Sequence, residues 1–271
     1  MNLLQNLHTH SRYDDGADTL EEMIAVARQK GFTSLGFSGH SYMHYAPDHS
    51  MSLEGTEAYK KEVRALQEKY RGEFDIFCGL EFDLYSEIDL SGYDYLIGSV
   101  HYLLRDGRQV GFDRSAEVVQ SVINTHFHGD GLAYAKAYYE TLATLPQYGR
   151  FDIVGHFDLI TKHSERVHFF DEESPAYRRA ALEAAEVLAG KIPFFEVNTG
   201  AISRGYRKTP YPTVFLLKEL RRMGFGAVIS SDCHDGRYLD CGFEESAALL
   251  RESGFTERYI LTQNGFTAVA L

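Results

Sequence analysis

The chain has 271 residues, 44% of them hydrophobic, which is enough for one large α/β domain or two small ones with a sizeable buried core. Its formal net charge of −12 disfavours a nucleic-acid partner, because phosphate-binding faces need clustered Lys and Arg. Three cysteines form no even disulfide framework, and no apolar run approaches the roughly 20 residues that span a membrane. We therefore expect a cytoplasmic protein without a membrane partner; the sequence does not indicate an oligomeric state.

Short apolar segments alternate with amphipathic ones along the whole chain, as in repeated β-α units around a parallel sheet. Seven strands are predicted, which is close to a full barrel. Their ranges are 3–8, 34–37, 74–80, 95–100, 153–156, 194–197 and 227–230. Because no Gly/Ser/Pro linker divides the chain, we predict a single α/β domain over residues 1–271.

Helix signals lie between these strands. The segment Asp18-Thr19-Leu20-Glu21-Glu22 offers an N-cap and a capping-box Glu before a helix that stops at Gly31, and Ser174-Pro175 begins a helix that stops at Gly190. Further helices are expected over 57–70, 132–145, 213–223 and 244–252. Residues 106–147 depart from the alternation, and we expect two helices there that cap one side of the site.

Titratable residues gather at the predicted strand ends, where barrels place their reactive groups. His8 and His10 end the first strand and Asp232 and His234 follow the last, each pair with the i, i+2 spacing of one strand face. The other candidates are Asp15, His40, Glu81, His101 and His156. This set of nitrogen and oxygen ligands suits zinc, manganese or iron, whereas Cys233 alternates away from the shared face.

These segments resemble the polymerase-and-histidinol-phosphatase (PHP) superfamily, whose motifs occur here in family order. The matching segments are HTH at 8–10, DDG at 14–16, SGH at 38–40, Glu81, SVH at 99–101, GHFD at 155–158 and SDCH at 231–234. Within the superfamily, the segments at 128–140, 155–163 and 196–212 look like the histidinol-phosphate phosphatase branch.

The resemblance implies a distorted TIM-like (β/α)7 barrel that holds two or three divalent ions, with Glu81 bridging two of them. The first ion would take His8, His10, Glu81 and Asp232. The second would take Glu81, His101 and His156, and the third Asp15, His40 and His234. Many relatives carry His where this chain has Asp15, and an oxygen ligand there would favour a harder ion or weaken the third site.

Phosphoester hydrolysis agrees with this set on physical grounds, because the uncatalysed reaction needs rate enhancements of up to about 10²¹-fold. Three divalent ions balanced by three carboxylates would leave roughly three positive charges to attract a phosphate dianion. The expected nucleophile is a metal-bridged hydroxide held by Glu81 that attacks phosphorus in line. The side chains expected around it are His8, His10, His101, His156 and Asp232.

Phosphate recognition should also use fixed cations, and the most basic loop of the chain, 198–208, follows the sixth predicted strand. We expect Arg204 first and Arg207 second to bind phosphate, because an Arg side chain can grip it with two hydrogen bonds. Lys162 is a third candidate. Asp158 is expected either to orient a ligand imidazole or to cap a helix.

The favoured function is hydrolysis of L-histidinol phosphate in histidine biosynthesis, a substrate assignment that depends on the resemblance alone. A first alternative keeps the chemistry with another small phosphate, a nucleotide or a phosphotyrosine peptide as substrate. An amidohydrolase also opens with HxH, but it usually needs a carbamylated lysine where this chain has Glu81. A distant alternative is a non-catalytic metal-binding regulatory module.

Overall fold

The computed structural model describes residues 3–271, so that the first two residues of the expected 1–271 domain lie outside the described range. Within that range the main sheet has seven parallel strands, in the order β1-β2-β3-β4-β7-β8-β9. They are β1 (Gln5–Asn6), β2 (Ser34–Phe37), β3 (Asp75–Asp83), β4 (Tyr95–Ser99), β7 (Ile153–Val154), β8 (Phe194–Asn198) and β9 (Gly226–Ser230).

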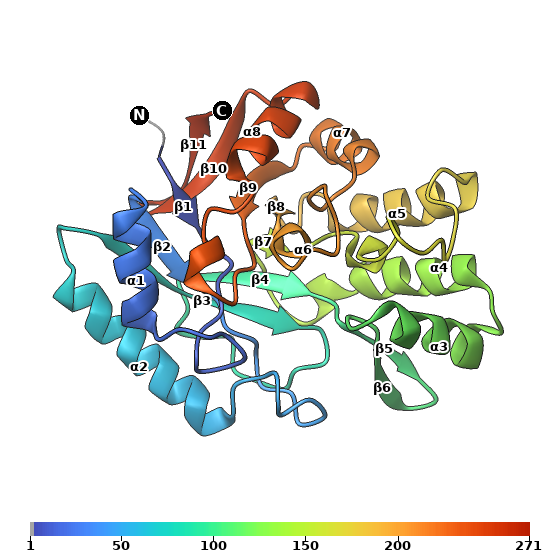
Figure 1. The fold of residues 1–271 in the computed structure, drawn as a ribbon, viewed down its shortest axis with the longest axis horizontal. Coiled ribbons are helices and arrows are strands. Elements are labelled where there is room, and N and C mark those ends of the chain that lie inside the picture. The colour runs from blue at the N-terminus through green and yellow to red at the C-terminus, as the bar shows by residue number, and fades with distance from the viewer. Residues whose placement is uncertain (1–2) are drawn as a thin grey trace.

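The sheet curls until its first and last strands meet, with the helices outside it (Figure 1). An isolated parallel bridge joins Thr9 to Cys233, and the N–H of His10 donates to the carbonyl of Cys233 at 2.9 Å. The sheet is thereby nearly closed, which confirms the distorted seven-stranded barrel. It also confirms that all seven expected strands belong to one sheet of a single domain.

The helices follow the expected alternation. The longer ones are α1 (Leu20–Gln29), α2 (Leu53–Lys69), α3 (Ala116–Phe127), α4 (Gly131–Leu142), α5 (Pro175–Leu188), α7 (Val214–Arg222) and α8 (Phe243–Glu252); α6 (Gly200–Ser203) is a single turn. Thr19 and Glu22 form the predicted capping box of α1, and Ser174 caps α5 with Pro175 in its first turn. Among residues 3–271, no helix combines the length and apolar character needed to cross a membrane.

Two hairpins were not predicted. β5 (Tyr102–Arg105) pairs with β6 (Arg108–Gly111) across Asp106-Gly107, so residues 106–111 are turn and strand, and the two helices expected within 106–147 are α3 and α4. Both turn residues have positive φ, the conformation of the type I′ turn that Asp-Gly favours. β10 (Glu257–Thr262) and β11 (Gly265–Ala270) form the second hairpin, and Leu261 packs with Leu7 and Tyr95 inside the barrel.

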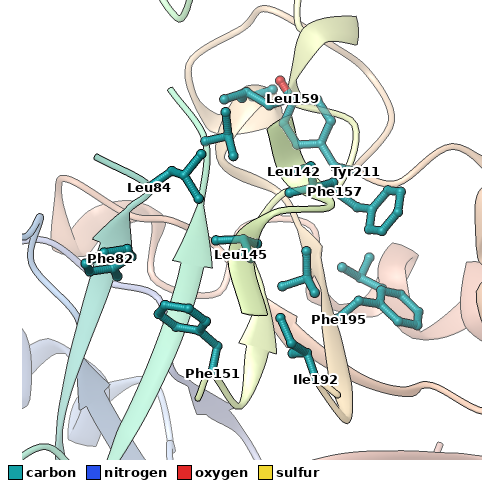
Figure 2. Close-up of a cluster of buried hydrophobic side chains, with 14 of the residues drawn as sticks. Phe82, Leu84, Leu142, Leu145, Phe151, Phe157, Leu159, Ile192, Phe195 and Tyr211 are labelled. Carbon is teal, nitrogen blue, oxygen red and sulfur yellow. The ribbon is translucent and has the colours of Figure 1, made fainter. Parts of the chain in front are cut away.

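The main core lies between the sheet and the helices. Figure 2 shows part of it, where Phe82 of β3 and Leu84, the residue after this strand, belong to the same cluster as Leu142 of α4, Leu145 and Phe151. All five side chains are nearly or fully buried. A rigid outer layer of this kind holds the strands in register and thereby sets the positions of the strand ends.

Candidate metal centre and substrate pocket

The carboxyl ends of the strands bring the six expected histidines into one cluster. His8 and His10 follow β1, and their ring centroids are 5.2 Å apart. The ring of His10 lies 4.4 Å from that of His40 after β2 and stacks at 4.0 Å on that of His234 after β9. His101 and His156, which follow β4 and β7, have ring centroids 4.8 Å apart.

Glu81 lies among these rings, near the carboxyl end of β3, with only 1% of its surface exposed. Its Oε2 atom is 3.1 Å from Nε2 of His8 and 2.9 Å from Nδ1 of His40. Its Oε1 atom is 3.0 Å from Nε2 of His156. Burial alone would raise the pKa of Glu81, but His8, His40 and His101 hold it well below its usual value. Glu81 is therefore an anion surrounded by imidazoles.

Two further carboxylates complete the cluster. Oδ1 of Asp232 lies 3.3 Å from Nε2 of His10, and Oδ1 of Asp15 lies 3.1 Å from Nε2 of His234. The residues 3–271 contain three sets whose ligand atoms lie within 4.8 Å of one another. These sets are His10, Asp15, His40 and His234; His8, His10 and Asp232; and His40, Glu81 and His101. His10 and His40 each belong to two sets, whereas the family pattern assigns each to one ion.

The donor atoms of this cluster fit a divalent cation. Nε2 of His8, Nε2 of His10, Nδ1 of His40 and Oε2 of Glu81 are buried and have no hydrogen-bond partner within the described part of the chain. Buried polar atoms normally have a partner, because leaving one unsatisfied costs roughly 1–3 kcal/mol. Imidazole nitrogens together with carboxylate oxygens are the donors that zinc, manganese and iron accept.

Three buried carboxylates behind the imidazoles were not predicted from the sequence. Asp14 lies 2.6 Å from Nδ1 of His10, Asp83 lies 2.9 Å from Nδ1 of His101, and Glu196 lies 2.9 Å from Nδ1 of His8. Carboxylates in this position orient ligand imidazoles in metal sites. Two of them carried a signal in the sequence: Asp14 opens the DDG segment, and Asp83 follows Glu81 by two positions on the same strand.

Asp158 has neither of its expected roles. It lies next to the short turn that follows β7, but its side chain does not cap that turn and instead accepts the N–H of Thr213 at 2.9 Å. Burial raises the pKa of Asp158 to about 6. Its carboxylate therefore anchors the segment that leads into α7 rather than an imidazole.

A cavity of about 230 Å³ opens beside the cluster and is lined by His101, Asp232 and His234. Arg204 and Lys162 also line it; Arg204 lies 3.0 Å from Oδ2 of Asp232, and Lys162 pairs with Asp113. Asp113 and Arg114 line the cavity as well, and both follow the unpredicted β5–β6 hairpin.

Arg207 is not among the residues that line this cavity. It is 7% exposed, and its guanidinium donates to the carbonyl of Thr161 at 2.9 Å. Of the three cations expected to bind phosphate, the structure therefore places Arg204 and Lys162 at the cavity, whereas Arg207 is buried against Thr161. Two larger clefts, of about 740 and 630 Å³, contain none of the nine expected ligands.

Comparison with known proteins agrees with this geometry. Residues 6–200 match the PHP domain family. The chain is 28% identical to the "Probable histidinol-phosphatase" of Deinococcus radiodurans, covering 87% of this chain and 88% of that protein. It is 26% identical to the histidinol-phosphatase of Bacillus subtilis, covering 91% and 97% respectively.

A solved structure has the same fold. It is the histidinol phosphate phosphatase of Lactococcus lactis in complex with zinc, L-histidinol and phosphate, which superimposes with a TM-score of 0.72 at 20% identity over 97% of this chain and 98% of that one. The family match extends over well more than half of the 271 residues and includes seven of the nine clustered side chains. The chain therefore belongs to the PHP domain family.

Proposed function

We propose that this protein is a metal-dependent phosphomonoesterase that converts L-histidinol phosphate into L-histidinol and inorganic phosphate. The observation that carries the proposal is one cluster of six imidazoles and three carboxylates, most of them buried, beside a cavity lined by Arg204 and Lys162. The substrate is supported by relatives of nearly the same length that carry the histidinol-phosphatase name. The Lactococcus lactis protein also binds L-histidinol and phosphate.

Two or three divalent ions would bind the cluster, with Glu81 between two of them. The proposed ligand sets are His8, His10, Glu81 and Asp232; Glu81, His101 and His156; and Asp15, His40 and His234. When bound, such ions neutralise phosphate charge and make a water molecule nucleophilic near neutral pH. Zinc is supported by the Lactococcus lactis complex, and manganese and iron accept the same donors.

The protein's own side chains prepare this site. Asp14 and Asp83 each accept a hydrogen bond from Nδ1 of one imidazole in the proposed site, so that the Nε2 lone pair of that ring is directed into the cluster. Arg204 approaches from the loop after β8 and Lys162 from the turn after β7. Both cations can hold the non-bridging oxygens of a phosphate that lies over the cluster.

The wall of the cavity also includes Met43, Tyr102 and Gly111. Tyr102 and Gly111 face each other across the β5–β6 hairpin, and a Cβ atom at Gly111 would lie 2.8 Å from the Tyr102 ring. The wall is thus a mixed apolar and aromatic surface suited to a small organic leaving group such as an amino alcohol with an imidazole ring.

The proposal is tested by phosphate release from a panel of phosphomonoesters. Metal-depleted protein would be reconstituted with zinc, manganese or iron and given L-histidinol phosphate, a nucleoside monophosphate, a phosphotyrosine peptide and a sugar phosphate. We expect kcat/KM for L-histidinol phosphate to exceed that for the others by at least about 100-fold, and chelation to abolish turnover. Better turnover of another ester would reject the substrate, and metal-independent turnover would reject the mechanism.

A further inference from the structure

Glu196 is a fully buried carboxylate that accepts hydrogen bonds from groups on several strands of the barrel. It lies on β8 and has no exposed surface. Its Oε1 atom accepts the backbone N–H of His156 and the side-chain amide of Asn198, both at 2.7 Å. Its Oε2 atom accepts the hydroxyl of Ser230 on β9 at 2.5 Å and lies 2.9 Å from Nδ1 of His8, after β1.

We propose that Glu196 is a positioning residue that fixes the Nδ1–H tautomer of His8 and thereby presents the Nε2 lone pair of His8 to the metal cluster. The inference depends on the metal site of the proposed function and adds a residue that lies outside the ligand set. Glu196 acts on metal binding through His8, and not by contact with metal or substrate.

The hydrogen bonds to Glu196 indicate which ring nitrogen of His8 carries the hydrogen. The amide of Asn198 and the backbone N–H of His156 are donors by chemistry, so Oε1 of Glu196 is an acceptor. Three donors other than His8 reach the two oxygens of Glu196, and hydrogen bonds of this number favour the ionised carboxylate, which has no proton to give. Nδ1 of His8 therefore carries the hydrogen of its bond to Glu196. A neutral imidazole with hydrogen on Nδ1 has its lone pair on Nε2.

The far side of the His8 ring agrees with this assignment. Nε2 of His8 is buried without a hydrogen-bond partner among residues 3–271 and lies 3.1 Å from Oε2 of Glu81 and 3.9 Å from Oδ1 of Asp232. The amide of Asn198 also approaches Oδ2 of Asp232, at 3.4 Å. Glu196 therefore lies directly behind the part of the cluster where His8, Glu81 and Asp232 converge.

Glu196→Gln should change the tautomer of His8 while keeping the other hydrogen bonds of position 196. The amide oxygen of Gln at the Oε1 position keeps the bonds from His156 and Asn198, and the Ser230 hydroxyl can rotate to accept from the new amide. Nδ1 of His8 then faces a donor, so that the favoured tautomer carries hydrogen on Nε2, toward the cluster. We expect metal affinity to fall by about 10- to 100-fold, as for other groups that orient metal ligands.

Zinc affinity would be measured by competition with a chromophoric chelator, together with bound zinc per chain and the melting temperature of the metal-free protein. Ser230→Ala is the matched control, because it removes a neighbouring hydrogen bond to Oε2 and leaves the carboxylate. Its zinc affinity should stay within about threefold of wild type. Glu196→Asp keeps the charge and should retain more affinity than Glu196→Gln.

His8→Ala provides the decisive background. If Glu196 acts through His8, Glu196→Gln should weaken zinc binding in the wild type and cause no further loss in His8→Ala. Equal losses in both backgrounds, or wild-type affinity in Glu196→Gln, would overturn the inference. If Glu196→Gln does not fold, ¹⁵N NMR of the zinc-loaded wild type decides, because hydrogen on Nε2 of His8 contradicts the proposal. A wild-type protein that binds no divalent ion would instead reject the proposed function.

Discussion

Oε1 of Glu81 lies 3.0 Å from Nε2 of His156, although 75 positions separate the two residues in the chain. β3 and β7 both flank β4 in the sheet, so their carboxyl ends lie on the same rim of the barrel. Because the other oxygen of Glu81 reaches His8 and His40, one carboxylate connects imidazoles that follow three different strands.

Glu81→Gln should therefore disturb several ligand imidazoles at once, and not only the one side chain that is replaced. The change preserves shape but removes the negative charge that faces several imidazoles, so we expect bound metal to fall and kcat/KM to drop by at least about 100-fold. Metal content by elemental analysis and phosphate release from L-histidinol phosphate would be measured on the same sample. Full metal content together with full activity would contradict the role assigned to Glu81.

Arg204→Ala and Arg207→Ala should differ in kind, although the two residues are three positions apart. Arg204 lines the cavity, so its loss should raise KM and lower kcat, reducing kcat/KM roughly 10- to 100-fold. Arg207 is buried and donates to the carbonyl of Thr161, so its loss should destabilise the fold by about 1–3 kcal/mol.

Steady-state kinetics and urea unfolding of both variants would separate these effects. Arg204→Lys serves as a control that keeps the charge without the bidentate geometry, and it should recover part of the loss in KM. Unchanged kinetics in Arg204→Ala, or a larger loss of kcat/KM in Arg207→Ala at equal stability, would reverse the assignment.

The difference between these two arginines also shows how far the sequence could predict the site. Both lie in one basic loop, and their spacing does not specify which guanidinium faces inward. In the structure the short helix α6 directs Arg204 toward Asp232, whereas Arg207 contacts Thr161 after β7. Side-chain direction in a loop depends on tertiary contacts, which local sequence patterns do not encode.

The ligands at the strand ends were predictable, because their positions follow from the strands rather than from the conformation of a loop. His8, His40 and His101 lie shortly after the ends of β1, β2 and β4. All parallel strands of a barrel end at one rim, so order along the chain becomes proximity in space. Glu196 was not predictable in this way. It lies inside a strand, and its partners His8 and Ser230 belong to other strands. The β10–β11 hairpin was likewise missed, because the packing of Leu261 depends on residues distant in the sequence, such as Leu7 and Tyr95.

Metal binding should strengthen as the pH rises. Burial alone would lower the pKa values of His10 and His101, but Asp14 beside His10 and Glu81 beside His101 raise them to about 10 and about 9 in the metal-free protein. A pKa raised on folding contributes stability below the unfolded value of about 6.5, and this contribution is lost as the pH rises through 9 to 10. A metal ion competes with the same protons.

The stability of metal-free protein, measured by urea unfolding, should therefore decrease between pH 6.5 and pH 10. The increase in melting temperature caused by a fixed zinc concentration should be larger at pH 8.5 than at pH 6.5. His101→Gln should reduce this pH dependence, because it removes one of the competing protons. An equal zinc-induced increase at both pH values would show that these imidazoles bind no metal.

Gly200→Ala tests how closely the backbone approaches the site. A Cβ atom at position 200 would lie 2.6 Å from Nη2 of Arg204 and 2.9 Å from Oδ2 of Asp232. The methyl group would displace the flexible guanidinium and press on the carboxylate, which is held by Asn198 and His10. We expect kcat/KM to fall roughly tenfold or more, with an overpacking cost of about 1–3 kcal/mol in stability.

The effect of the methyl group should depend on Arg204. If displacement of the guanidinium accounts for most of the loss, Gly200→Ala should lower kcat/KM less in an Arg204→Ala background than in the wild type, because the displaced group is already absent. Equal losses in both backgrounds would place the effect on Asp232 instead, and zinc affinity should then fall with activity. Unchanged kcat/KM and zinc affinity in Gly200→Ala would show that neither side chain needs its present position.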